Sequence, residues 1–280
     1  MNHMQSGMSV GFIGLGDQGL PMAKALAEGG FDLHVWARRP LSYKDLGKVR
    51  YTAHDGLGAL AQACSVVALC LRTDDDLFEV VQNGLLTGLK KGSVIVNHGT
   101  GTPANAGHLA ELCAQHRIES LDAPVSGARR GAEEKTLTTL VGGPEAVANR
   151  CEPLFQSFSR HVVYLGDSGS GQAAKLFNNT MMIMNQANVA DLVDLASRYG
   201  LNLWKLIEAI KLCSGFSNSL IHINTVLTPE TAPHMAAVEA EDMDIFAKVM
   251  ANAGIDAEAV VARGHHGAKM LPDLIRKLNC

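Results

Sequence analysis

Three glycines lie where a short apolar segment meets a helical pattern near the start of the chain. Residues 9–14 are apolar enough for a buried strand, and Gly14, Gly16 and Gly19 fit the spacing G-x-G-x-x-G, just before a helical pattern over residues 20–27. In such a unit the first glycine allows a tight turn, the second lets a pyrophosphate approach the backbone, and the third allows close helix–strand packing. The chain is therefore expected to contain a dinucleotide-binding βα unit.

The rest of the first half repeats this alternation of apolar strands and helical stretches, which is typical of a doubly wound, mostly parallel sheet of the Rossmann type. Further strands are expected over residues 31–37, 65–71, 92–97, 117–122, 136–143 and 161–165. The second half is helical throughout, with helices expected over residues 173–199, 203–213, 217–226, 239–252 and 256–266. The sequence thus predicts an α/β fold in which a Rossmann domain is followed by an all-α C-terminal domain, joined by a long interdomain helix.

The expected domain bounds follow from this pattern. Residues 8–167 should form the dinucleotide-binding domain, and residues 168–280 the helical domain. Residues 1–7 are expected to be a disordered lead-in or a tag, since no apolar segment typical of a signal peptide follows them.

The end of the second expected strand bears on which dinucleotide is bound. An NAD site usually carries Asp or Glu there to hold the ribose 2′-hydroxyl, whereas this strand ends in Ala37, Arg38 and Arg39. Guanidinium groups suit a 2′-phosphate, because their planar fork can pair with two phosphate oxygens. The sequence favours NADP, with NAD possible; the alternative is a solvated basic turn without a role in binding.

Loops at the carboxyl ends of the next strands should face the same ligand. Thr100 lies in one of them, where its hydroxyl can bond the nicotinamide ribose or the substrate. His98 is a conceivable general base, although a histidine in such a loop is more often merely polar. The complete predicted dinucleotide site consists of Gly14, Leu15, Gly16, Asp17, Gln18, Gly19, Ala37, Arg38, Arg39, Leu71, Arg72 and Thr100.

Lys175 and Asn179 are four residues apart at the start of the long helix, so they lie on one face of it. Gly169 and Gly171 precede them as a turn, and Asn178 lies close by. An amine and an amide in this position can handle a proton and hold a polar substrate. Taken alone, such a pair is more often a solvated lysine and a helix-capping amide.

Composition argues against several classes of function. A net charge of −4 is not the basic footprint of a nucleic-acid-binding protein, and no apolar run is long enough to span a bilayer. Six cysteines without a C-x-x-C pair indicate a reduced, cytoplasmic protein rather than a disulfide scaffold. No His, Asp or Glu cluster has metal-ligand spacing, so no metal is expected.

Three motifs in the right order make the chain resemble the β-hydroxyacid dehydrogenase family over about residues 9–276. Residues 11–23, GFIGLGDQGLPMA, are similar to its cofactor signature and include a Pro-Met pair that ordinary Rossmann proteins lack. Residues 122–127, DAPVSG, and the glycines and threonines of 131–143 are similar to its substrate-loop signature. Residues 169–179 resemble its catalytic signature, Gly-x-Gly-x-x-x-Lys-x-x-Asn-Asn.

The resemblance implies hydride transfer between NADP(H) and a small 3-hydroxy acid or semialdehyde. It implies that Lys175 is the general acid/base and that Asn179 orients the substrate or the lysine. The implied substrate-binding residues are Ser126 and the backbone of Gly127, which would hold a carboxylate, together with Asn178 and Thr100. The implied partners are a small-molecule carboxylate and further copies of this chain, in a homodimer or homotetramer formed through the helical domain.

The chain departs from the family pattern at several places. Residues 97–100, Asn-His-Gly-Thr, stand where the family has Asp-x-Ser-Thr, and Glu241 stands where it has a lysine that helps to close over the cofactor. Arg129 and Arg130 follow the carboxylate loop, where they either recognise a second anionic group or, more commonly for such residues, are simply exposed. Residues 215–217 resemble a substrate-pocket turn of the family.

Two other functions fit the same fold. One is an imine-reductase-like enzyme, and the other is a non-catalytic NADP-binding scaffold protein. Imine reductases generally replace the catalytic lysine, and a degenerate scaffold would be expected to lose it, so Lys175 argues against both. Glu241 and the altered loop at residues 97–100 keep the scaffold alternative open.

Overall fold

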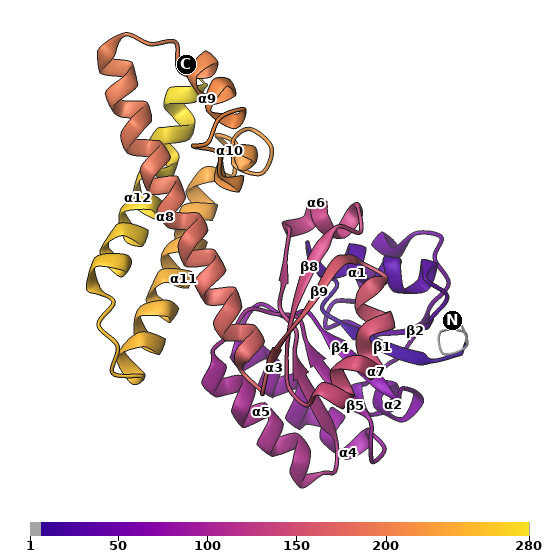
Figure 1. Cartoon of the computed structure of the whole chain (residues 1–280). Coiled ribbons are helices and arrows are strands. Elements are labelled where there is room, and N and C mark those ends of the chain that lie inside the picture. The colour runs from indigo at the N-terminus through magenta and orange to yellow at the C-terminus, as the bar shows by residue number, and fades with distance from the viewer. Residues whose placement is uncertain (1–6, 280) are drawn as a thin grey trace. The chain divides into compact units, whose positions relative to one another are not determined.

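The structure, a computed structural model, describes residues 7–279 and divides into two compact units, Met1–Lys175 and Leu176–Cys280 (Figure 1). The boundary between the units lies inside a single long helix, α8 (Ser170–Tyr199). The lead-in expected over residues 1–7 lies outside the described residues, apart from Gly7. Each unit has its own apolar core.

The first unit is built on one sheet, whose described strands have the order β3-β2-β1-β4-β5-β6-β8-β7, with β9 paired to β8. Strands β1 to β6 pair in parallel, as does β8 with β9, while β8 runs antiparallel to β6 and β7. The strands are β1 (Ser9–Ile13), β2 (Asp32–Trp36), β3 (Thr52–Ala53), β4 (Val66–Leu69), β5 (Val94–Asn97), β6 (Glu119–Asp122), β7 (Val125–Ser126), β8 (Leu137–Gly142) and β9 (Ser159–Gly166). The predicted doubly wound, mostly parallel sheet is confirmed.

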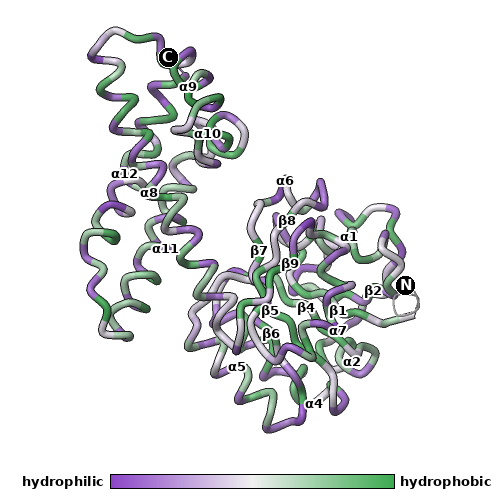
Figure 2. The backbone as a smooth tube through the Cα atoms, viewed as in Figure 1, coloured by the Kyte–Doolittle hydropathy of each residue, from purple (hydrophilic) through white to green (hydrophobic). Residues whose placement is uncertain are grey.

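Two apolar cores cover the two faces of this sheet. Successive side chains of a strand point to opposite faces, and in β4 Val66 and Ala68 join one core while Val67 and Leu69 join the other. A strand buried on both faces must be apolar at every position, which is why β4 and β5 are largely green in Figure 2. The helices of this unit are α1 (Gly19–Glu28), α2 (Leu57–Ala63), α3 (Asp74–Val80), α4 (Leu86–Gly88), α5 (Pro103–Gln115), α6 (Ala128–Glu133) and α7 (Glu145–Gln156), with a 3₁₀ segment η1 (Pro40–Leu46) and a π segment η2 (Val81–Leu85).

The second unit is helical, as predicted. It consists of the rest of α8, α9 (Leu203–Lys211), α10 (Asn218–His222), α11 (Ala232–Asn252) and α12 (Glu258–Leu278). The last two helices are longer than the sequence pattern indicates, because α11 begins at Ala232 and α12 continues through Pro272. Gly267 lets α12 approach α8 closely, since a Cβ atom there would lie 2.4 Å from the carbonyl oxygen of Ile183. No helix within residues 7–279 is long and apolar enough to cross a membrane.

Candidate active site

The glycine loop joins β1 to α1, and packing explains two of its three glycines. Gly14 has a φ of +100°, and a Cβ atom there would lie 2.1 Å from the carbonyl oxygen of Cys70. A Cβ atom on Gly19 would lie 1.9 Å from the carbonyl oxygen of Gly14. Gly16 has open space around its Cα, so its backbone is accessible at the N-terminus of α1. This cradle fits a pyrophosphate, which the N–H groups of a helix N-terminus favour.

The loop that follows β4 contacts both the glycine loop and the loop that follows β5. Gly14 is packed against Cys70, and Gly99 is packed against Leu71, where a Cβ atom would lie 2.5 Å from the carbonyl oxygen. Leu71 and Thr100, both predicted to belong to the dinucleotide site, therefore lie at the same edge of the sheet as Gly14. That edge is the carboxyl end of the parallel strands, where open α/β sheets bind their ligands.

Asp122 fixes the start of α8 to this edge of the sheet. It is the last residue of β6 and is buried, and its carboxylate accepts the N–H groups of Gly169 at 2.8 Å and Gln172 at 2.9 Å. Burial raises the pKa of Asp122, and the N–H donors oppose that rise. A Cβ atom on Gly171 would lie 2.5 Å from the carbonyl oxygen of Leu140, so the turn needs a glycine there. The carboxylate thus satisfies helix N–H groups that have no partner inside the helix.

Gln172 connects the same helix to the loop that carries Thr100. Its Oε1 accepts the N–H of Gly101 at 2.8 Å, and its Nε2 donates to the carbonyl oxygen of Gly99 at 2.7 Å. The Gln172 side chain is buried, so these two bonds hold the backbone on both sides of Thr100. Asp122 and Gln172 were not predicted to have a role in the site. The signal in the sequence was their position, since one opens the DAPVSG motif and the other follows Gly171.

Lys175 lies one turn beyond Gln172 on α8 and is half-buried. It is the last residue of the first unit, which also contains the glycine loop, Thr100 and Ser126. Ser126 ends β7, which runs parallel to β6, and Gly127 follows it with a φ of +130°. The first unit therefore contains both the proposed proton carrier and the proposed carboxylate loop.

The two predicted asparagines belong to the second unit. Asn179 donates from Nδ2 to Oδ2 of Asp242 on α11 at 2.8 Å. Asn178 is exposed and donates from Nδ2 to Oδ1 of Asn179 at 3.1 Å. The Asn179 amide is thus held by a carboxylate, with its oxygen accepting from Asn178.

Arg38 follows β2, as predicted, but its guanidinium contacts α3. Its Nη1 and Nη2 donate to Oδ1 of Asp76 at 3.1 Å, and Nη2 also donates to Oε2 of Glu79 at 3.0 Å. Ala37 donates its N–H to the hydroxyl of Tyr43, which fixes the turn before Arg38. Arg38, which was predicted to bind a 2′-phosphate, is therefore paired with the carboxylates of Asp76 and Glu79 in this structure.

Comparisons with known proteins agree with this architecture. The model for the NAD binding domain of 6-phosphogluconate dehydrogenase matches residues 9–166, and the model for the NAD-binding domain of NADP-dependent 3-hydroxyisobutyrate dehydrogenase matches residues 169–266. The 2-(hydroxymethyl)glutarate dehydrogenase of Eubacterium barkeri is 32% identical over 78% of this chain and 73% of its own length. The chain belongs to the β-hydroxyacid dehydrogenase family. It is therefore an oxidoreductase of the NAD(P)-dependent hydroxyacid dehydrogenase class.

Other members and solved structures of similar fold extend the comparison. The 2-hydroxy-3-oxopropionate reductase of Escherichia coli is 32% identical over 76% of this chain and 73% of its own length. A Mycobacterium tuberculosis 3-hydroxyisobutyrate dehydrogenase, solved with L-serine, has the same fold, with a TM-score of 0.85, 22% identity and coverage of 98% and 99% of the two chains. An imine reductase from Pseudomonas sp. has a TM-score of 0.67 at 17% identity, over 98% of this chain and 100% of that one.

His98 occupies the second position of the family's Asp-x-Ser-Thr loop and is a core residue. Its Nδ1 bonds to the carbonyl oxygen of Ala123 at 2.8 Å, and its ring meets Phe155 and Phe158 edge-on. Burial lowers the pKa of His98 to about 4, so the ring is neutral near pH 7. A fully enclosed imidazole cannot exchange protons with a substrate, so the structure does not support the hypothesis that His98 is a general base.

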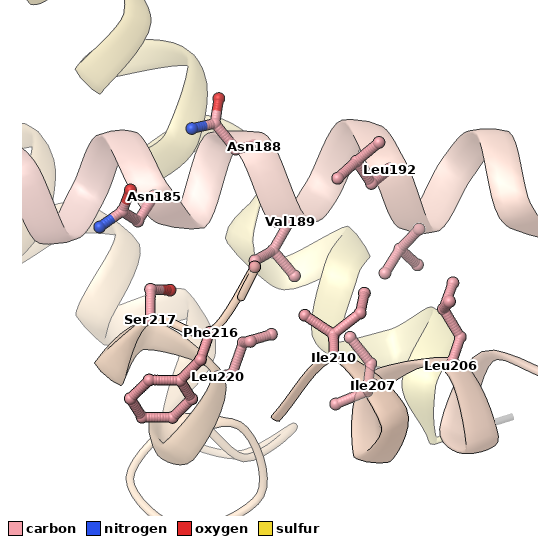
Figure 3. A pocket seen from close by; sticks show the side chains of 12 residues that line it. Asn185, Asn188, Val189, Leu192, Leu206, Ile207, Ile210, Phe216, Ser217 and Leu220 are labelled. Carbon is pink, nitrogen blue, oxygen red and sulfur yellow. The ribbon is translucent and has the colours of Figure 1, made fainter. Parts of the chain in front are cut away.

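The turn at residues 215–217, which resembles a substrate-pocket turn of the family, lines a pocket in the second unit (Figure 3). The pocket lies among α8, α9 and α10, and most of its wall is aliphatic. The side chains of Asn185 and Ser217 form a polar end, as Figure 3 shows. The turn therefore belongs to an apolar pocket of the helical unit.

Proposed function

We propose that this enzyme transfers a hydride between NADP(H) and a small 3-hydroxy acid or its semialdehyde, with Lys175 as the general acid/base. The observation that carries the proposal is the anchoring of α8 by Asp122 and Gln172 in the unit with the glycine loop. A lysine one turn beyond these anchors is held by a rigid element, which is what a proton-transfer group requires.

Each residue has a role that its chemistry supports. When bound on the glycine loop, the dinucleotide would supply the hydride or accept it. Hydride addition to an aldehyde carbon leaves an alkoxide oxygen, which needs a proton donor within hydrogen-bond reach. Lys175 would donate that proton from Nζ in reduction and take it back in oxidation. Ser126 and the N–H of Gly127 would bind the carboxylate, and Asn179, held by Asp242, would orient the hydroxyl or the lysine.

The proposal is tested by measuring nicotinamide absorbance with a panel of short semialdehydes and 3-hydroxy acids. NADPH and NADH are run in parallel, with a cyclic imine and a ketone–amine mixture as the comparison arm. Turnover of carboxylate-bearing aldehydes but not of imines is expected, because Lys175 and Ser126 suit an alkoxide beside a carboxylate. Reduction of imines alone would favour the imine-reductase alternative, and binding without any turnover would favour a scaffold protein.

The proposed preference for NADP rests on Arg38 and Arg39, which follow β2 at the place where an NAD site usually carries an acidic residue. Arg38→Ala is expected to raise the Kd of NADPH by about 10- to 100-fold, the range of a charge-assisted hydrogen bond, and to leave the Kd of NADH within about twofold. Fluorescence titration of each reduced dinucleotide measures both constants. An equal rise for both would mean that Arg38 supports the fold of the loop, not the 2′-phosphate.

We further propose that the helical unit forms the contact of a homodimer or homotetramer. Large apolar side chains of this unit are exposed in the single chain, among them Leu192 and Leu195 at 56% and Tyr199 at 84%. Such side chains on one helix are typical of a buried interface. Sedimentation equilibrium of wild type and Leu195→Glu is expected to show an oligomer that the variant weakens; a monomeric wild type would contradict the proposal.

A further inference from the structure

Asp17 places a carboxylate inside the glycine loop, directly after Gly16. Its side chain is 80% exposed, and Gly16 is the position at which the backbone is open to a pyrophosphate. A carboxylate there repels the negative charges of a pyrophosphate, and the repulsion is strongest at low ionic strength. A chain that binds a dinucleotide through this loop therefore gains from a cation that offsets Asp17.

Arg129 is that cation. Its Nη1 donates to Oδ1 of Asp17 at 2.8 Å, across 112 residues of sequence, and its Nε donates to Oε1 of Glu133 at 2.7 Å. Arg129 lies on α6, which packs against α1, the helix that follows the glycine loop. The guanidinium therefore bridges the glycine loop and the helix that begins after the carboxylate loop.

Two residues with positive φ precede Arg129 and set the direction in which α6 begins. Gly127 has a φ of +130° and Ala128 a φ of +54°, so α6 begins with an alanine in the left-handed region. A residue with a Cβ atom adopts that conformation at a cost of about 1 kcal/mol. A strained residue directly before Arg129 fixes the direction in which α6 starts.

We propose that Arg129 is a positioning residue for the dinucleotide: it neutralises Asp17 and draws the pyrophosphate onto the glycine loop. This assigns Arg129 to the cofactor and not to a second anionic group of the substrate. Without Arg129, the carboxylate of Asp17 would lie in the glycine loop without the guanidinium that pairs with it. The inference rests on the dinucleotide site of the proposed function and concerns one residue within it.

Arg130 provides a matched control on the same helix. Its side chain is 62% exposed against 52% for Arg129, and it makes the same kind of i,i+4 pair, donating from Nε to Oε1 of Glu134 at 2.7 Å. Within residues 7–279, Arg130 makes no hydrogen bond or ion pair with the glycine loop. Arg129→Ala and Arg130→Ala thus remove the same charge and the same helix pair, and differ in the contact with Asp17.

The test is the Kd of NADPH and of NADH by fluorescence titration at low and at physiological salt. Arg129→Ala is expected to raise both constants by about 3- to 5-fold at low salt, less at high salt, as for a partly screened charge contact. Arg130→Ala should change them less than about twofold. When Asp17→Asn is introduced into the Arg129→Ala variant, most of the lost dinucleotide affinity should return, because the two residues form one coupled pair.

The outcomes separate this inference from the function on which it rests. A wild-type chain that binds neither dinucleotide overturns the dinucleotide site as a whole. Equal effects of Arg129→Ala and Arg130→Ala, or no recovery by Asp17→Asn, overturn the role of Arg129 alone. A raised KM for substrate with an unchanged Kd for NADPH would instead assign Arg129 to the substrate. Thermal unfolding of each variant checks that α6 is intact.

Discussion

Lys175→Ala is expected to lower kcat by about a thousandfold or more, while the Kd of NADPH changes less than about twofold. General acid–base catalysis by a positioned side chain contributes about 10²- to 10⁴-fold, and Lys175 is the proposed carrier of the transferred proton. Dinucleotide binding should persist because the glycine loop lies between β1 and α1, and its close packing is against the backbone of Cys70 and of Gly14. Steady-state kinetics on the best substrate of the wild type, together with fluorescence titration of NADPH, measure the two effects separately.

A conservative variant sharpens this test. Lys175→Arg keeps the positive charge but cannot release its proton near neutral pH, since an arginine stays protonated. It should therefore bind NADPH like the wild type and turn over as slowly as Lys175→Ala. Gln172→Ala offers a positioning control: it should lower kcat less than Lys175→Ala does, because it loosens the loop around Thr100 and leaves the amine in place. A fully active Lys175→Ala enzyme would refute the proposed mechanism.

The sequence predicted correctly those elements whose structure depends on residues close together in the chain. The glycine spacing around Gly14 and the apolar strand at Val66–Leu69 follow from backbone clashes and from burial on both faces, and both can be read from neighbouring residues. The last helix was predicted too short because Pro272 and the polar residues before it interrupt the pattern. There the burial of Leu271, Leu274 and Ile275 in the core of the helical unit outweighs the cost of a proline within the helix.

The positioning contacts could not be predicted, because they join residues that are distant in sequence. Asp122 meets Gly169 across 47 residues, and Gln172 meets Gly99 across 73. Arg38 was predicted to be near a phosphate, yet its pairing with Asp76 depends on where α3 lies in the folded sheet. Resemblance to a family predicts which side chains do chemistry, and the structure shows which side chains fix the backbone around them.

The buried acid Glu239 is the other residue for which a large effect is expected. It lies on α11, is 2% exposed, and its Oε2 accepts from Nε2 of Gln186 on α8 at 2.6 Å. Burial raises the pKa of Glu239 to about 7, and the nearby carboxylate of Asp242 adds to the rise. Oε1 of Gln186 is buried without a partner among the described residues, and a protonated Glu239 can supply the missing donor.

This raised pKa makes the stability of the helical unit depend on pH. The pKa of Glu239 is about 7 in the folded state and 4.5 in the unfolded state. Proton binding by Glu239 therefore contributes fully to the free energy of unfolding below pH 4.5, and this contribution is lost as the pH rises through 7. The loss amounts to about 3 kcal/mol, from 1.36 kcal/mol for each pKa unit. Glu239→Gln keeps the shape and offers a permanent N–H donor to Gln186. Its stability should therefore exceed that of the wild type increasingly from pH 5 to about pH 7, and by a nearly constant amount above that.

Urea unfolding at a series of pH values measures this difference directly, because the variant and the wild type differ in one titrating group. Glu208→Gln is the matched control, since Glu208 is an exposed glutamate of the same unit that pairs with Lys211 at the surface. Its unfolding free energy should follow that of the wild type at every pH. If the unfolding free energies of Glu239→Gln and the wild type differ by the same amount at every pH from 5 to 8, Glu239 is not the titrating group. If they diverge, the proton on Glu239 holds α8 against α11, the two helices that carry Asn179 and Asp242.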